Sequence, residues 1–432
     1  MTKLTAIRGF KDILPRETGK WRHVEAIARQ VFAGYGIHEI KIPLLEKTEL
    51  FKRGIGETTD IVEKEMYTFL DRGDEYLTLR PEATASVIRA YLEHSMHQSD
   101  SLTKLFTIGP MFRRERPQKG RFRQFHQINV EYIGLKDPRI DSELIAMLMH
   151  FLSSTGLTGL RLEINSLGCP RCRPAFRDNV QRLLSDKKDT LCADCQRRLE
   201  TNPLRIFDCK NASCQESIAG IPTILEYICN DCGDHFEKVK KYLELLGVAY
   251  TINARMVRGL DYYTQTAFEI TTESLGAQNA VAGGGRYDGL TKILGGPEIP
   301  GIGFAIGLER LISLVPGNYE DFVQSPHLFI AALGERAQEF AFRLCDALRK
   351  AGIRSEMDFS DRSLKSQMKR SDRFNCPHTL IIGERELDEG KAPLRDMTTK
   401  EQELLDIGST DGIVSALLDR IGKVPAGNTR ER

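Results

Sequence analysis

The sequence lacks both a long apolar run and an excess of one charge sign. Its 61 lysines and arginines nearly balance 60 aspartates and glutamates, so the net charge is +1 and no bulk field would attract a polyanion. The N-terminal MTKLTAIRGFKDILPRE has no apolar stretch of signal-peptide length, and nothing further along approaches a membrane span. Internal repeats and low-complexity tracts are also absent. We therefore expect a cytoplasmic globular protein with no membrane partner, which would bind any polyanion through local patches.

A chain of 432 residues is too long for one hydrophobic core, and its composition changes along its length. Residues 1–165 mix helical and strand periodicities, and the same mixture of periodicities returns at 249–320. Residues 166–248 hold eight of the ten cysteines and many charges, which predicts a cysteine-rich, mainly helical insertion into a split domain. After a linker marked by proline and glycine, residues 327–432 alternate strands with amphipathic helices and predict a small α/β domain.

The cysteines are not expected to form disulfides in a cytosolic chain. Eight of them fall in four closely spaced pairs: Cys169 and Cys172, Cys192 and Cys195, Cys209 and Cys214, and Cys229 and Cys232. This spacing favours one or two structural Zn²⁺ sites of four thiolates each. Reduced thiols without metal are the alternative, and the sequence does not give the pairing. Cys345 and Cys376 are expected to pack in hydrophobic cores.

Residues 105–134 predict two strands joined by a loop that is too long and too basic for a simple hairpin. On the second strand, alternation places Phe125, Gln127, Asn129 and Glu131 on one face. A row of polar groups on a strand is costly unless it lines a site. The loop carries six cations, a density that suits phosphates, although a solvated hairpin tip is the alternative. These cations are Arg113, Arg114, Arg116, Lys119, Arg121 and Arg123.

Two segments pass from a predicted strand into a predicted helix. In YLTLRPEATASVIRAYLEH, residues 76–94, the change falls at Pro81 and Glu82 lies in the first turn of the helix. A carboxylate there would complement the helix dipole even without another role. In PGIGFAIGLERLISLV, residues 300–315, a glycine-spaced strand leads into an amphipathic helix, and Arg310 falls off the apolar stripe in its first turn.

Two further segments combine aromatic rings, glycines and a cation. MVRGLDYYTQTAFEI, residues 256–270, predicts a turn and a strand, and it opens with Arg258 and Asp261. A cation beside aromatic rings often faces an anionic ligand, although an ion pair between these two residues is the simpler explanation. AVAGGGRYDGL, residues 280–290, adds three consecutive glycines, for which a flexible turn is the simpler explanation.

Taken together, these segments resemble the histidyl-tRNA synthetases, a family of class II aminoacyl-tRNA synthetases, over essentially the whole chain. GYGIHEIKIPLLEKTELFKRGIGETTDIVEKEMYTF resembles the dimer-forming motif 1, FRRERPQKGRFRQFHQINVE motif 2, and GIGFAIGLER motif 3. RGLDYYT and GGGRYDGL resemble the two signatures of the histidine enzymes. The resemblance implies an α+β fold, with a mostly antiparallel catalytic sheet, the cysteine-rich insertion and a C-terminal anticodon-binding domain. It also implies a homodimer.

The resemblance assigns roles to particular residues. Arg113 and Arg310 would hold the phosphates of ATP, and Glu131 would position adenine or substrate. Arg258 would lie beside the α-phosphate and the substrate carboxylate, doing the work that other class II enzymes give to a metal ion. The histidine pocket would comprise Glu82, Ala83, Thr84, Gln127, Glu131, Arg258, Tyr262, Tyr263 and Tyr287. Ala83 and Phe122 stand where glycine and tyrosine are common in the family, and neither is expected to abolish activity.

Contacts with tRNA are implied at two places. Arg116 and Gln118 of the motif 2 loop would meet the acceptor end. In the C-terminal domain, four cations follow one predicted helical face: Arg362, Lys365, Lys369 and Arg373. A solvated basic face is the alternative, but phosphate contact is favoured beside a synthetase core.

The resemblance implies a ligase reaction. The chain would form histidyl-adenylate and pyrophosphate from L-histidine and ATP with Mg²⁺, then transfer the histidyl group to the 3′ end of tRNA(His). A non-catalytic, histidine-sensing regulatory subunit of histidine biosynthesis is one alternative, but such proteins typically lack the anticodon domain and the catalytic signatures. A zinc-dependent nucleic-acid-binding protein is another, but it leaves the ATP-site segments without a purpose.

Overall fold

The computed structural model describes residues 3–57, 59–117, 120–275 and 279–421. The chain divides into two compact units, Met1–Gly317 and Asn318–Arg432. Within the described ranges, no helix is both long and apolar enough to cross a membrane. Gln118 of the expected tRNA-binding residues lies outside the described residues.

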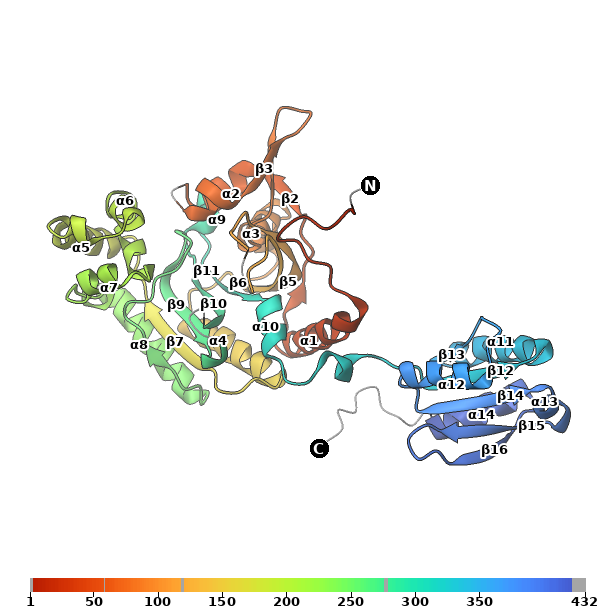
Figure 1. Cartoon of the computed structure of the whole chain (residues 1–432). Coiled ribbons are helices and arrows are strands. Elements are labelled where there is room, and N and C mark those ends of the chain that lie inside the picture. The colour runs from red at the N-terminus through yellow and green to blue at the C-terminus, as the bar shows by residue number, and fades with distance from the viewer. Residues whose placement is uncertain (1–2, 58, 118–119, 276–278, 422–432) are drawn as a thin grey trace. The chain divides into compact units, whose positions relative to one another are not determined.

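An eight-stranded sheet forms the centre of the first unit (Figure 1). The pairings from β5 through β7 in the sheet are all antiparallel, and only the outermost pairs β1–β5 and β7–β8 are parallel. This confirms the mostly antiparallel sheet. The strand order is β1 (His38–Glu39), β5 (Thr103–Phe112), β6 (Gln124–Ile133), β11 (Gly301–Gly307), β10 (Ala280–Arg286), β9 (Thr264–Thr271), β7 (Arg161–Ser166) and β8 (Thr251–Ile252).

Helices pack against this central sheet, and the first unit also contains a small second sheet. Helix α4 begins at a proline whose preceding residue, Asp137, accepts a hydrogen bond from the backbone N–H of Arg139, and its buried stripe includes Leu144, Leu148 and Phe151. The helices are α1 (Pro15–Gly34), α2 (Thr48–Ile55), α3 (Thr84–Glu93), α4 (Pro138–Ser154), α9 (Leu290–Ile293) and α10 (Leu308–Leu314), and a π-turn spans Ile61–Glu65. The small sheet has the order β2 (Leu45–Lys47), β4 (Tyr76–Leu79) and β3 (Tyr67–Leu70).

The three consecutive glycines lie inside β10, so the flexible turn considered for them is wrong. A β-carbon on Gly284 would lie 2.1 Å from the carbonyl oxygen of Gly303 on β11. On Gly285 it would lie 2.6 Å from the carbonyl oxygen of Thr266 on β9. The glycines therefore permit the close approach of three neighbouring backbones at the centre of the sheet.

The cysteine-rich segment between β7 and β8 is mainly helical, as predicted. It contains α5 (Arg173–Ser185), α6 (Ala193–Thr201), α7 (Ala212–Ile218) and α8 (Asn230–Leu245), with the 3₁₀ turn η4 (Pro203–Asp208) between α6 and α7. Its core includes Phe176, Leu199 and Ile206. The segment belongs to the same compact unit as the sheet, so its status as a separate domain with limits 166–248 stays a prediction.

The second unit is a small α/β fold, as predicted. Its five-stranded sheet has the order β13 (Ser355–Met357), β12 (Leu328–Leu333), β14 (His378–Gly383), β15 (Lys391–Asp396) and β16 (Gln402–Asp406). Its helices are α11 (Glu335–Lys350), α12 (Leu364–Arg373), α13 (Glu384–Glu389) and α14 (Thr410–Ile421). Cys345 and Cys376 are buried in two separate apolar clusters, which confirms their packing role.

Candidate active site

A cavity of about 330 Å³ opens over the central sheet where β6, β9, β10 and β11 lie side by side. It collects residues from the three class II motif segments, the Glu82 segment and both signature segments. Among the residues that line it are Glu82, Thr84, Arg113, Gln127, Arg258, Tyr262, Tyr263 and Arg310. Because β6 pairs with β11, and β11 with β10, motifs far apart in the chain meet at one place.

Arg258 lies in the turn before β9, and its partner differs from the one considered from the sequence. Its guanidinium pairs with Glu269 of β9 at 3.1 Å and lies over the Tyr263 ring, 5.6 Å from the centroid. Asp261 instead accepts a hydrogen bond from the Asn202 side chain at 2.9 Å. Burial acts to lower the pKa of Arg258, but Tyr263, Glu269 and Asp208 outweigh it and raise this pKa. The cation is therefore permanently charged beside the cavity.

The sequence predicted Glu82 in the first turn of α3, but the structure places it before the helix, which begins at Thr84. Its two carboxylate oxygens accept hydrogen bonds from the backbone N–H groups of Thr84, at 2.7 Å, and Ala85, at 2.9 Å. The helix therefore starts two residues later, with Glu82 satisfying its first donors. Burial raises the pKa of Glu82, while these hydrogen bonds oppose the change. Ala83 is fully buried at the N-cap of the helix.

Glu131 and Tyr287, both predicted for the histidine pocket, do not line the cavity but lie behind Thr84, which does; we call this pair the floor. The Tyr287 hydroxyl donates to one Glu131 oxygen at 2.6 Å, and the Thr84 hydroxyl donates to the other at 2.7 Å. Glu131 and Tyr287 are each 1% exposed. Burial raises the pKa of Glu131 to about 8, against the opposing effect of the two hydroxyls. Near neutral pH this carboxyl therefore holds a proton for much of the time.

The predicted polar face of β6 points into the cavity. Phe125, Gln127 and Asn129 all line it. The buried Gln127 Oε1 and Asn129 Oδ1 accept no hydrogen bond from the described residues. Buried acceptors of this kind suit a ligand with N–H groups. The alternation in the sequence predicts Asn129 on the polar face of β6, but Asn129 was not among the predicted ligand-binding residues.

Arg113 and Arg310 lie on the cavity wall. Arg113 donates from Nε to the carbonyl oxygen of Pro81 at 2.9 Å, and its guanidinium lies 5.2 Å from the centroid of the Phe125 ring. Arg310 donates from Nη1 to the carbonyl oxygen of Ala280 at 2.5 Å. Burial lowers the pKa of Arg310, and the neighbouring Arg121 lowers it further. The cations flank one volume, which suits a polyanionic ligand.

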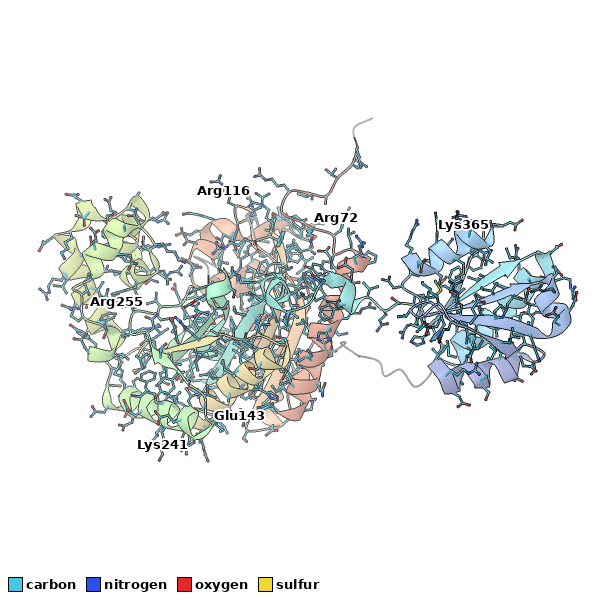
Figure 2. All side chains as sticks on the ribbon, turned by 60° about the horizontal axis from the view of Figure 1, so that its bottom comes forward. Arg72, Arg116, Glu143, Lys241, Arg255 and Lys365 are labelled. Atoms are coloured by element: carbon cyan, nitrogen blue, oxygen red, sulfur yellow. The ribbon has the colours of Figure 1, made fainter. Side chains whose placement is uncertain are left out.

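The loop that joins β5 to β6 has two different sides. Arg116 is exposed at its tip (Figure 2), whereas Arg121 lines the cavity and pairs with Glu115 at 3.0 Å. Glu309, next to Arg310, accepts from the backbone N–H of His126 at 2.9 Å and lies 2.9 Å from its Nδ1. Glu309 thus fastens the base of the loop to α10.

Arg286 lies away from the cavity, fully buried against Asp141 of α4 at 2.6 Å. Asp141 also accepts from Thr266 and contacts His235 of α8. This charged cluster joins the second signature segment to the helices below the sheet. Its role is therefore structural rather than one of ligand contact.

Sequence reasoning missed Glu269, the carboxylate that pairs with Arg258. The available signal was a single charge in the otherwise uncharged strand TQTAFEIT. It also missed Glu309, whose neighbour Arg310 drew attention instead. Glu309 acts on His126, which lies 183 residues away in the sequence. Glu269 lies eleven residues from Arg258, on the other side of a turn, so neither helical nor strand spacing predicts the pair.

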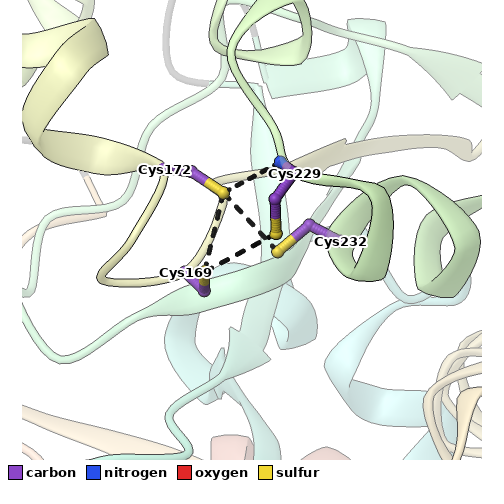
Figure 3. Close-up of side chains that lie close together, drawn as sticks. All are labelled: Cys169, Cys172, Cys229 and Cys232. Carbon is purple, nitrogen blue, oxygen red and sulfur yellow. Dashed lines mark hydrogen bonds between the residues drawn. The ribbon is translucent and has the colours of Figure 1, made fainter.

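The eight paired cysteines form two clusters of four, which settles which pairs lie together. The proximal tetrad consists of Cys169, Cys172, Cys229 and Cys232 (Figure 3), and the distal tetrad of Cys192, Cys195, Cys209 and Cys214. Within each tetrad the four sulfur atoms lie within 4.8 Å of one another. Four convergent thiols at this separation could hold a metal ion such as Zn²⁺.

In the second unit, three of the four predicted tRNA-binding cations lie on α12. Lys365 (Figure 2), Lys369 and Arg373 are exposed on this helix. Arg362 precedes the helix, whose N-cap is Ser363, so the prediction of four cations on one helical face is wrong for Arg362. Its carbonyl oxygen accepts from the Gln367 side chain at 2.9 Å, in the turn that leads into the helix.

Comparison with known proteins agrees with this geometry. Residues 9–311 match the family model described as histidyl-tRNA synthetase, and residues 327–417 match the anticodon binding domain. The histidine–tRNA ligase of Geobacter sulfurreducens is 57% identical over 399 residues, which cover 92% of this chain and 96% of that protein.

Solved structures give the same result. The apo histidyl-tRNA synthetase of S. aureus superposes with a TM-score of 0.80 at 36% identity, covering 98% of this chain and 100% of that one. An ATP phosphoribosyltransferase regulatory subunit/histidyl-tRNA synthetase from Bacillus halodurans C, 20% identical with a TM-score of 0.65 over 89% of this chain and 100% of that one, shares the fold. The chain belongs to the histidyl-tRNA synthetase family.

Proposed function

We infer that the chain is a histidine–tRNA ligase, an ATP-dependent enzyme that activates L-histidine and transfers it to tRNA(His). The observation that carries this inference is the cavity over the central sheet, where Arg113, Arg258 and Arg310 surround one volume beside Glu82 and Tyr263. The relative from Geobacter sulfurreducens matches over 92% of this chain, second unit included, which favours the ligase over a regulatory subunit.

In the first step, the histidine carboxylate attacks the α-phosphorus of MgATP and pyrophosphate leaves. Negative charge grows on the phosphorus oxygens, and a cation fixed beside them stabilises that state more than the ground state. Arg258 is assigned this role, because its pairing with Glu269 orients the guanidinium before the ligand arrives. Arg113 is assigned to the α-phosphate and Arg310 to the γ-phosphate end.

Histidine selection is assigned to the polar groups around Tyr263. An imidazole offers two nitrogens, and the pocket must satisfy both. Glu82 accepts hydrogen bonds, Tyr263 can donate or accept, and the amide of Gln127 supplies an acceptor. Buried polar groups committed in this way reject amino acids that lack the matching hydrogen bonds by roughly 10⁴-fold or more.

The second step needs tRNA. Arg116, exposed beside the cavity, is assigned to the acceptor end, together with Gln118. Lys365, Lys369 and Arg373 of α12, with the preceding Arg362, are assigned to tRNA phosphates. We further propose that the enzyme is a homodimer, acts in the cytoplasm, and holds one structural Zn²⁺ in each cysteine tetrad.

The test is ATP–pyrophosphate exchange with each of the twenty amino acids in turn. Exchange with histidine alone, followed by charging of tRNA(His), is the expected result. A folded protein that binds histidine but gives no exchange would contradict the ligase and support the regulatory subunit. Replacing Lys365, Lys369 and Arg373 by alanine together should slow charging and leave exchange unchanged.

A further inference from the structure

The two cysteine tetrads have the same chemistry but different surroundings. Cys169 and Cys172 follow β7 directly, and Cys229 and Cys232 lie at the start of α8, so the proximal tetrad stands where the insertion leaves and re-enters the sheet (Figure 3). The distal tetrad lies within the insertion, around α6 and α7.

The proximal tetrad adjoins the start of β9, the strand that follows Tyr263. Leu167 and Gly168, just before Cys169, are joined to the start of β9 by three hydrogen bonds. The backbone N–H of Leu167 donates to the carbonyl oxygen of Gln265 at 2.6 Å, and the N–H of Gln265 donates to that of Gly168 at 2.9 Å. The Thr264 hydroxyl donates to the same Gly168 oxygen at 2.9 Å.

Gln265 links the strand to the tetrad directly. Its φ of 49° lies in the left-handed region, which is unfavourable for a residue other than glycine. Its side-chain amide donates to the Cys232 sulfur at 3.7 Å, and the side chain is buried. An N–H donor oriented toward a metal-bound thiolate is the outer-shell contact that fixes such ligands. The contact would also hold Gln265 in its unusual conformation.

Arg173 adds a second connection on the other side. It follows Cys172 as the first residue of α5, and its guanidinium donates to the backbone carbonyl oxygens of Tyr263 and, at 3.2 Å, of Leu167. A shift of the Cys169–Cys172 turn would therefore move the backbone of Tyr263, whose side chain lines the cavity.

The distal tetrad reaches the cavity by a different route. Arg205 of η4, the turn that leads to Cys209, donates to the carbonyl oxygen of Gly259 at 2.6 Å, and Gly259 lines the cavity. In the part of the chain that the structure describes, no hydrogen bond joins the distal tetrad to Tyr263 or Gln265. Its sulfur atoms accept hydrogen bonds from the backbone N–H groups of Cys192 and Asn211, at 3.2 and 3.5 Å. The surrounding apolar cluster, which includes Val180, Leu199 and Ile218, belongs to the insertion.

We propose that Zn²⁺ bound by the proximal tetrad positions the Tyr263–Gln265 segment and thereby sets the affinity for histidine. Zn²⁺ in the distal tetrad instead supports the insertion helices and η4, which contact the turn at Gly259 and Asp261 but not the Tyr263–Gln265 segment. The proposal rests on the proposed function, since it names what the cavity binds. The four proximal cysteines are thus positioning residues that act through Gln265 and Arg173.

A matched pair of variants tests the proposal. Cys229→Ser breaks the proximal tetrad and Cys209→Ser the distal one, and both cysteines are half-buried. Metal analysis should find two Zn²⁺ per wild-type chain and one in each variant. Calorimetry should show histidine binding weakened by about 10-fold in Cys229→Ser, the scale of one lost hydrogen bond between a displaced Tyr263 and the ligand. In Cys209→Ser it should change by less than about 2-fold.

ATP affinity separates positioning from general damage, and it should stay within about 2-fold of wild type in both variants. Equal effects of the two variants on histidine, or an unchanged histidine affinity in Cys229→Ser, would overturn the proposal and leave the ligase assignment intact. A wild-type protein without zinc would overturn it as well. A wild-type protein that binds no histidine would overturn the proposed function with it.

If Cys229→Ser does not fold, Gln265→Ala provides the test. It removes the amide that contacts Cys232 but leaves all eight thiols in place. The expected result is two Zn²⁺ per chain with histidine affinity reduced several-fold and ATP affinity unchanged. Wild-type histidine affinity in this variant would overturn the proposal.

Discussion

The floor and the wall of the cavity over the central sheet differ in how their polar groups are satisfied. On the floor, Glu131 receives hydrogen bonds from Tyr287 and Thr84 and is almost completely buried. On the wall, Arg258 meets Glu269 in a pair whose side chains are 18% and 29% exposed. The floor is satisfied from within the protein, whereas the wall presents charge that a ligand can reach.

The difference indicates that the floor maintains the shape of the cavity, whereas the wall supplies the charge that the reaction needs. A neutral, hydrogen-bonded floor gives a ligand a rigid surface at little electrostatic cost, because a carboxyl with a raised pKa need not be charged when buried. A fixed cation on the wall is costly to bury but stabilises charge that develops during the reaction. Changes on the wall should therefore reduce the rate of adenylation most, and changes on the floor should act mainly on stability.

The largest effect is expected from Arg258→Ala. Loss of the cation should lower ATP–pyrophosphate exchange by about 10²-fold or more, the scale for one transition-state electrostatic contact. Thermal unfolding should be close to that of wild type. Arg72→Ala, which removes an exposed arginine from the turn between β3 and β4 (Figure 2), is the charge-matched control and should leave exchange unchanged. An active Arg258→Ala enzyme would contradict the assigned role.

The next effect is expected from Gly283→Ala. The new β-carbon would lie 2.5 Å from Nη2 of Arg258, so this flexible side chain must move while the backbone stays in place. Displacing a reacting group by a fraction of an ångström should lower exchange by about 10-fold or more. Gly289→Ala is the matched control, because its β-carbon meets no atom within 4 Å. Similar rates in the two variants would show that the position of Arg258 does not matter.

For the floor, the pH dependence of the free energy of unfolding should show that Glu131 is protonated in the folded protein. Its pKa of about 8 in the folded state lies above the ordinary glutamate value of 4.5, so between these two values the folded protein holds a proton that the unfolded chain releases. The contribution is fully present below pH 4.5 and is lost as pH rises toward 8. The slope from this group is at most about 1.4 kcal/mol per pH unit.

Glu131→Gln supplies the comparison for this prediction. The amide mimics the protonated carboxyl, because its oxygen accepts from one of the two hydroxyls and its N–H₂ group donates to the other, which turns to accept. Urea unfolding between pH 5.5 and 8.5 should show that wild type loses more stability than Glu131→Gln as pH rises. Parallel curves for the two proteins would mean that Glu131 stays charged in the fold.

The smallest effect is expected from Tyr287→Phe. It removes one hydrogen bond to Glu131 and should lower the free energy of unfolding by about 1 kcal/mol. Exchange should fall by less than about 3-fold, because Tyr287 lies beneath the cavity rather than in its lining. A loss of exchange as large as that of Arg258→Ala would erase the distinction between floor and wall.

The sequence predicted the polar face of β6, the strand-to-helix junction at Arg310 and the aromatic turn at Arg258, because alternation and helical spacing are local properties. It misjudged the start of α3, since a carboxylate that caps a helix resembles one inside its first turn. It misjudged Arg362 for a similar reason, because the basic spacing begins before the helix does. Boundaries of this kind depend on which backbone groups are satisfied from outside the helix.

By itself, the sequence determined the strand-to-helix segments at Glu82 and Arg310, the family, and the presence of four thiol pairs. Only the tertiary structure decided that Arg258 pairs with Glu269 rather than Asp261, and that Cys169 and Cys172 join Cys229 and Cys232. The physical reason is that β7 and α8 bring two short loops together across about sixty residues of chain. Spacing along the sequence fixes which groups a turn presents, but the packing of the sheet fixes which turns meet.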